Sequence, residues 1–107
     1  MKLANNFYGM LGLATKAGKC VFGAESCAKS VKTGKAYVVI ADCGLSARSM
    51  KDTVSMCDFY ETDLIVSEPE GRAGTACGKP AIRLIAVTDR NFAEQLLKIR
   101  NQSEVQI

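Results

Sequence analysis

The stretch Ala36-Tyr37-Val38-Val39-Ile40-Ala41 is a continuous apolar run, rich in β-branched residues, in a chain of 107 residues. A strand with one face in water alternates apolar and polar residues, whereas a strand covered on both faces is apolar throughout. This segment therefore predicts a central strand with helices packed on both sides of its sheet.

Two helices and a short strand are predicted before this run. The first helix ends at Gly18, and residues at helical spacing form its buried stripe: Leu3, Phe7, Met10, Leu11 and Ala14. Gly9 and Gly12 lower its helix propensity, so we expect both to admit another backbone. A strand over residues 20–22 leads to a second helix, which ends at Gly34 and has the apolar stripe Ala24, Cys27, Ala28 and Val31.

The alternation continues after the run. Ser46 is a natural N-cap for a third helix with the stripe Ala47, Met50, Val54 and Cys57. We then expect a strand over residues 64–66, a brief helix over 71–78 and a buried strand over 82–88. Asp89 can cap a last helix that carries Phe92, Leu96 and Ile99 inward. The pattern predicts one α/β domain over residues 1–100, followed by a frayed tail over 101–107.

Composition excludes several classes of protein. The chain is 48% hydrophobic, which suits one compact domain, and it has no apolar run near the roughly 18 residues of a membrane span. The N-terminus lacks the apolar core of a signal peptide, so we expect a cytoplasmic protein. Without histidine, neither a Cys-His nor a Ser-His nucleophile can be built, so we expect neither an enzyme nor a small-molecule substrate.

Five cysteines occur without a CxxC pair, which predicts reduced thiols that act as small buried hydrophobes. With ligands so far apart and no histidine, we expect no zinc and no other cofactor. Two glycine-rich segments, residues 12–19 and 74–79, match neither a Walker phosphate loop nor a Rossmann fingerprint.

Charge is unevenly distributed along the chain. Residues 1–36 carry +5, residues 37–70 carry −5 and residues 71–107 carry +3. If the first and last thirds meet, a basic surface forms opposite an acidic one, which suits a protein that docks a polyanion. Uneven charge is also common in small domains, so this pattern leaves both interpretations open.

Three segments stand out together: Gly23 to Lys29 at the start of the second helix, Gly34-Lys35-Ala36 before the central strand, and Gly74-Thr75-Ala76-Cys77-Gly78-Lys79. In this order they resemble a known family, the ribosomal proteins called large-subunit seven-Ae and thirty-e. The N-terminal Gly-Leu-Ala-Thr-Lys-Ala-Gly-Lys is most similar to the bacterial YlxQ-type branch. The resemblance covers residues 5–100. It implies a three-layer α-β-α sandwich, with a mixed four-stranded sheet and about five helices, that binds kink-turn or ribosomal RNA. We expect the protein to be a monomer.

The resemblance also implies two RNA-contacting segments. The first is the start of the second helix: Gly23, Ala24, Glu25, Ser26, Lys29 and Lys32. Backbone N–H groups at a helix N-terminus suit phosphate oxygens, and a Glu25 carboxylate can accept from a guanine edge. Gly23 could instead be a plain N-cap, Glu25 a first-turn acid and Lys29 a solvated partner of Glu25. Ser26 departs from the glutamate that is usual at this position in strong kink-turn binders.

The second implied segment is the loop before the last strand: Lys79, Pro80, Ala81, Ile82 and Arg83. Small apolar residues there can cover an unstacked base, and Pro80 stiffens the loop. Arg83 could instead be an outward residue of the strand. Residues 42–45 are expected to support the same rim. The alternative function is a protein-protein adaptor of the same fold, which would use the acidic middle third.

Overall fold

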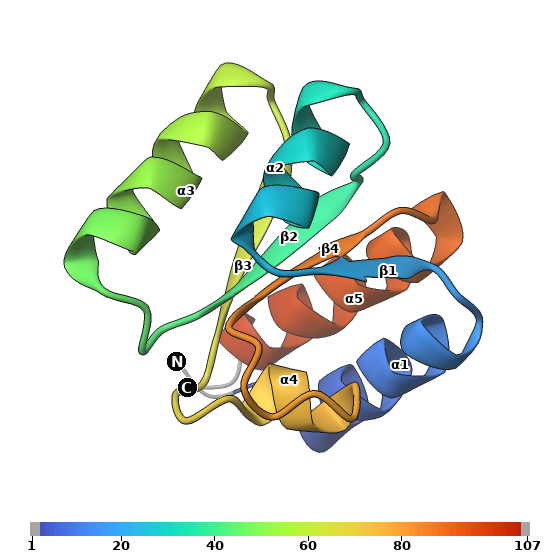
Figure 1. Ribbon diagram of the computed structural model, residues 1–107. Coiled ribbons are helices and arrows are strands. Elements are labelled where there is room, and N and C mark those ends of the chain that lie inside the picture. Colours follow the sequence, from blue (N-terminus) through green and yellow to red (C-terminus); the bar gives the residue numbers. More distant parts are fainter. Residues whose placement is uncertain (1–2, 106–107) are drawn as a thin grey trace.

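A computed structural model describes residues 3–105 and shows a four-stranded sheet between two helical layers (Figure 1). The elements in chain order are α1 (Asn5–Lys16), β1 (Cys20–Phe22), α2 (Ala24–Lys32), β2 (Val38–Asp42), α3 (Ala47–Phe59), β3 (Asp63–Ser67), α4 (Arg72–Ala76), β4 (Leu84–Val87) and α5 (Arg90–Val105). Five helices and a mixed sheet were expected, and both are confirmed.

The sheet has the strand order β1-β4-β2-β3, with β2 at its interior. β2 runs parallel to β3 and antiparallel to β4, so that Ile40 lies opposite Ile65 on one side and Ile85 on the other. All five residues of β2 are buried, as the continuous apolar run predicts. The strand begins two residues later than the run and extends one residue beyond it, to Asp42.

Two separate cores flank the sheet, because successive side chains of a strand point to opposite faces. Val38 and Ile40 join one core together with residues of α1, α4 and α5. Val39 and Ala41 join the other, under α2 and α3. β1 pairs with β4 and α1 lies beside α5, so the two basic thirds of the chain do meet (Figure 1).

Caps and stops mostly follow the sequence. Ser46 accepts a hydrogen bond at Oγ from the Ser49 amide at 3.1 Å, and Asp89 accepts one at Oδ2 from the Phe92 amide at 2.9 Å. Gly18 and Gly34 follow α1 and α2 with φ angles of 72° and 74°. These left-handed positions favour glycine because it has no Cβ.

Several expectations are corrected. Val54 is 38% exposed, and Thr53 is buried in its place because its hydroxyl donates to the Ser49 carbonyl at 2.8 Å. In α2, Ser30 is buried while Ala24 is exposed. A Cβ on Gly12 would lie 3.0 Å from the Ala76 carbonyl oxygen, as expected, but one on Gly9 would meet nothing within 4 Å. The predicted tail is helical over residues 101–105, and residues 106–107 lie outside the described part.

The cysteines are free thiols with different exposures. Cys27, Cys57 and Cys77 are buried as predicted, but Cys20 is half-buried and Cys43 is exposed, because it lies in the loop after β2. No cluster of metal-ligating side chains occurs among the described residues. None of the described helices is long and apolar enough to cross a membrane.

Ionisation of the Cys27 thiol in the unfolded state should lower the stability of the fold in alkaline solution. Burial raises the pKa of its thiol from 9.0 to about 12, so the folded state keeps a proton that the unfolded state releases. The stabilisation that Cys27 gives the folded state is fully present below pH 9 and is lost as the pH rises toward 12. In urea unfolding under reducing conditions, the free-energy gap between the native chain and Cys27→Ala should narrow by about 2 kcal/mol from pH 8.5 to 10.5. A constant gap would contradict this.

Candidate nucleic-acid interface

Three loops converge at one end of the sheet, where β1 and β2 end and β4 begins. The Gly23 amide donates to the Leu84 carbonyl at 2.9 Å, and the Asp42 amide donates to the Arg83 carbonyl at 2.9 Å. These two bonds place the start of α2 and the loop after β2 on either side of the segment that enters β4. The two segments that the family resemblance implies are therefore neighbours, although 46 residues lie between them in sequence.

The start of α2 is shaped by Gly23. Its φ of 90° is a conformation that side-chain-bearing residues rarely adopt, and a Cβ there would meet nothing within 4 Å. The glycine is thus required by backbone conformation and not by crowding. No side chain among the described residues caps this helix start, so its first N–H groups can donate hydrogen bonds to an anion.

The charged residues of α2 lie on its exposed surface. Glu25, Ser26, Lys29 and Lys32 are all exposed. The ion pair between Lys29 and Glu25 that the sequence allowed is not formed, and the ion pairs found among the side chains that the structure describes involve other residues. Lys29 therefore carries a charge that is available to a ligand. Glu25 lies in the first turn, where a carboxylate also interacts favourably with the helix dipole.

The loop over residues 79–83 is pressed against α4. The Lys79 amide donates to the Gly74 carbonyl at 2.7 Å, and the Ile82 amide donates to the Lys79 carbonyl at 3.0 Å. A Cβ on Gly74 would lie 2.5 Å from the carbonyl oxygens of both Lys79 and Ile82. Lys79 extends its ammonium over the Phe22 ring, 5.1 Å from the centroid. Pro80 and Ala81 are exposed, and Ile82 and Arg83 are half-buried.

Arg72 fixes α4, and hence this loop, to the rest of the molecule. Its guanidinium lies over the Tyr8 ring of α1, 4.4 Å from the centroid. It also donates to Asn5 Oδ1 at 3.0 Å and to Glu68 Oε2 at 2.9 Å. The seat of the loop is therefore tied to α1 and to the end of β3.

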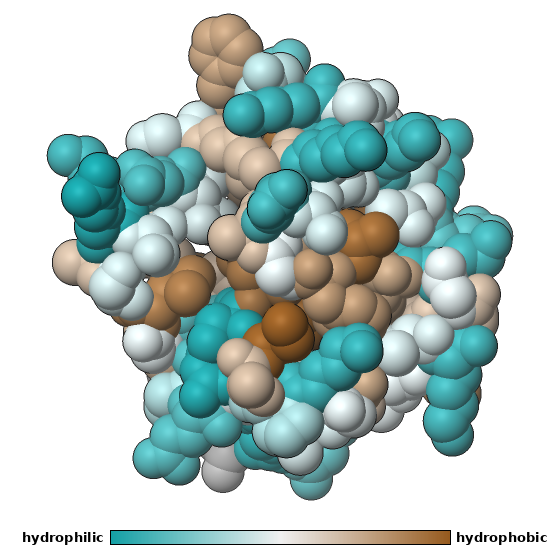
Figure 2. Space-filling view, viewed as in Figure 1, coloured by the Kyte–Doolittle hydropathy of each residue, from teal (hydrophilic) through white to brown (hydrophobic). Residues whose placement is uncertain are grey.

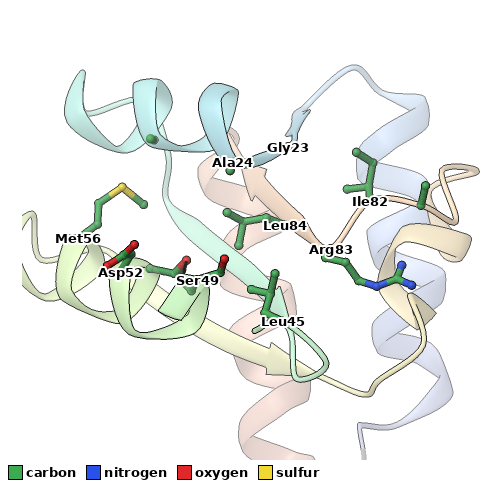
Figure 3. A pocket seen from close by; sticks show the side chains of 12 residues that line it. Gly23, Ala24, Leu45, Ser49, Asp52, Met56, Ile82, Arg83 and Leu84 are labelled. Atoms are coloured by element: carbon green, nitrogen blue, oxygen red, sulfur yellow. Dashed lines mark hydrogen bonds between the residues drawn. The ribbon is translucent and has the colours of Figure 1, made fainter. Parts of the chain in front are cut away.

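A groove of about 420 Å³ lies between α2, α3 and the 79–83 loop (Figure 3). Its walls are mainly apolar, with Leu45, Met56 and Ile82 among them, and Ser49 and Asp52 of α3 add polar groups. Figure 2 shows apolar residues across the middle of this face of the molecule and hydrophilic residues around them. Sequence reasoning did not include Ser49 and Asp52 in the site. Their spacing of three, followed by Met56, is the helical signal that places them on one face.

Known proteins are similar to this chain over most of its length. No protein-family profile matches the sequence. RNA-binding protein YlxQ of Bacillus subtilis (strain 168) is 29% identical over 93 residues, which cover 87% of this chain and 93% of the relative. Large ribosomal subunit protein eL30 of Sulfolobus acidocaldarius is 27% identical over 96 residues, covering 88% and 92%. Both relatives support the resemblance of this chain to the seven-Ae/thirty-e proteins, and in particular to their YlxQ-like branch.

Solved structures agree with this family fold. A Bacillus halodurans protein of unknown function superposes with a TM-score of 0.87 at 26% identity, covering 92% of this chain and 99% of that one. A 15.5kD RNA binding protein of Giardia lamblia gives a TM-score of 0.77, covering 94% and 92%. At 14% identity, the second similarity supports the fold alone. The seven-Ae/thirty-e architecture thus accounts for nearly the whole chain.

Proposed function

We propose that the chain binds RNA, and that its target is a kink-turn or a similarly bulged element in ribosomal or translation-associated RNA. The observation that carries the proposal is the Gly23–Leu84 hydrogen bond, since it joins an uncapped, lysine-bearing helix start to the residue that directly follows the 79–83 loop, beside an apolar groove. The names of the YlxQ and eL30 relatives support RNA as the ligand. We extend the proposal to a non-enzymatic, cytoplasmic role.

Each part of this surface suits a different part of an RNA. The first N–H groups of α2 and the ammonium groups of Lys29 and Lys32 would contact phosphates, while Glu25 would accept from a guanine edge. Ser26 can donate and accept, but it reaches less far than a glutamate. The 79–83 loop and the groove would cover a base that has left the stack, with Ser49 and Asp52 facing its polar edge (Figure 3).

Binding should depend steeply on salt and on RNA shape. Each neutralised phosphate contributes about −0.9 to the slope of log affinity against log salt, so the contacts of Lys29 and Lys32 predict a slope of about −2. We expect a kink-turn hairpin to bind at least tenfold more tightly than a plain duplex of equal length, as measured by fluorescence anisotropy at four salt concentrations. Equal affinity for the duplex would refute shape recognition, and no binding to either RNA would refute the function.

A further inference from the structure

We propose that Asp42 is the positioning residue of this rim: its buried carboxylate fixes three loops at once, and through Arg83 it sets the conformation of the 79–83 loop. The inference rests on the proposed RNA-binding function. Asp42 ends β2 and is only 2% exposed, so it would act on RNA through other residues and not by contact.

The Asp42 carboxylate accepts hydrogen bonds from two different loops. Its Oδ1 accepts from the Gly44 amide at 2.7 Å, in the loop between β2 and α3. Its Oδ2 accepts from the Gly71 amide at 2.7 Å, just before α4. Short bonds from N–H groups to a carboxylate are among the stronger hydrogen bonds in proteins, and burial makes their loss expensive.

Arg83 extends this arrangement to the third loop. Its Nε lies 3.9 Å from Asp42 Oδ2, and its Nη1 donates to the Pro80 carbonyl at 2.7 Å. Figure 3 shows the Arg83 side chain turned away from the groove, toward α4. The guanidinium therefore joins Asp42 to the turn at Pro80. In this position, Arg83 shapes the loop and has its charge offset by the carboxylate.

Glycines at both N–H donors allow the loops to come this close. A Cβ on Gly44 would lie 2.9 Å from Asp42 Oδ1, and one on Gly71 would lie 2.6 Å from the Pro80 carbonyl oxygen. Gly71 also has a φ of 70°, which favours glycine. The sequence thus leaves room for backbone and carboxylate where side chains would otherwise separate the loops.

Loops that are ordered before binding lose less conformational entropy when they meet a ligand. Asp42→Asn is close to isosteric, but its amide has one acceptor oxygen and one NH₂ donor. One of the two glycine amides would then face a donor, and Arg83 would lose its charged partner. We expect this variant to bind a kink-turn hairpin at least tenfold more weakly, with faster hydrogen exchange at Gly44 and Gly71. Exchange at Ile65 and Ile85 in the sheet should be unchanged.

Arg83→Gln separates positioning from direct phosphate contact, because it removes the charge of a half-buried residue and keeps a polar side chain. If Arg83 positions the loop, its loss weakens binding about fivefold and leaves the salt slope unchanged. If it contacts a phosphate, the slope becomes shallower by about 0.9, as expected for the control variant Lys29→Gln. The double variant that combines Asp42→Asn with Arg83→Gln should bind no more weakly than Asp42→Asn alone, because both changes disrupt the same set of loop contacts.

The RNA-binding function and the positioning role of Asp42 are refuted by different results. A native chain that binds no kink-turn hairpin refutes the RNA function, and hydrogen exchange in the free protein still tests whether Asp42 orders the loops. Unchanged exchange at Gly44 and Gly71 in Asp42→Asn, or a shallower salt slope in Arg83→Gln, overturns the assignment of Asp42.

Discussion

Replacing Gly74 by alanine is expected to destabilise the protein by about 3 kcal/mol and to weaken RNA binding at the same time. The added Cβ would lie 2.5 Å from two backbone oxygens, those of Lys79 and Ile82, and neither can rotate away as a side chain could. The 79–83 loop must then move off α4. Because that loop forms one wall of the groove, its displacement removes part of the proposed RNA surface. Urea unfolding and anisotropy titration with the kink-turn hairpin measure the two effects.

Gly9→Ala is the matched control for this prediction. Gly9 lies inside α1 and is exposed, and a Cβ added there would meet nothing within 4 Å. Alanine there should stabilise the helix by about 0.5–1 kcal/mol and leave RNA affinity unchanged. A Gly74→Ala variant with native stability and native affinity would show that the loop tolerates a shift of this size.

The contrast between these glycines shows where sequence reasoning reaches its limit. Gly9 and Gly12 lie in the same helix, three residues apart, and the same expectation was made for both. Only Gly12 meets another backbone, because α4 crosses α1 at that turn and leaves the previous one open. Helix spacing identifies candidate faces, but the crossing point is set by residues distant in sequence.

Local signals were sufficient where the interaction is local. The capping residues Ser46 and Asp89 bond to amides three positions later, within reach of any short-range pattern. In contrast, Asp42 contacts Gly71 and Arg83, 29 and 41 residues away, and only Gly44 is close in sequence. A lone aspartate after an apolar strand reads as a loop residue, so a supporting role was all that the sequence could predict.

The predicted α3 stripe was wrong at Ala47 and Val54, which are exposed, although Cys57 is buried and Met50 packs against the core. Val54 fits the helical period, but Thr53 can take its place because its hydroxyl donates to the Ser49 carbonyl. A buried hydroxyl that is bonded within its own helix carries little penalty. Thr53 lines the groove together with Ser49 and Asp52 of the same helix.

Lys29→Ala is expected to reduce kink-turn affinity about tenfold near 0.1 M salt and to make the salt slope shallower by about 0.9. Lys29 is exposed on α2 and takes part in none of the ion pairs of the described chain, so its charge is available to a phosphate. Alanine is a strong helix former, and the melting temperature should therefore change little. Anisotropy titrations over a salt series measure both quantities.

Lys98→Ala controls for net charge, because Lys98 is exposed on α5, in the helical layer on the other face of the sheet. Long-range attraction to RNA responds to total charge, whereas a phosphate contact responds to position. If both variants lose affinity equally, the protein attracts RNA without a defined site on α2. A loss confined to Lys29→Ala places a phosphate beside α2, within reach of the same RNA that the 79–83 loop would cover.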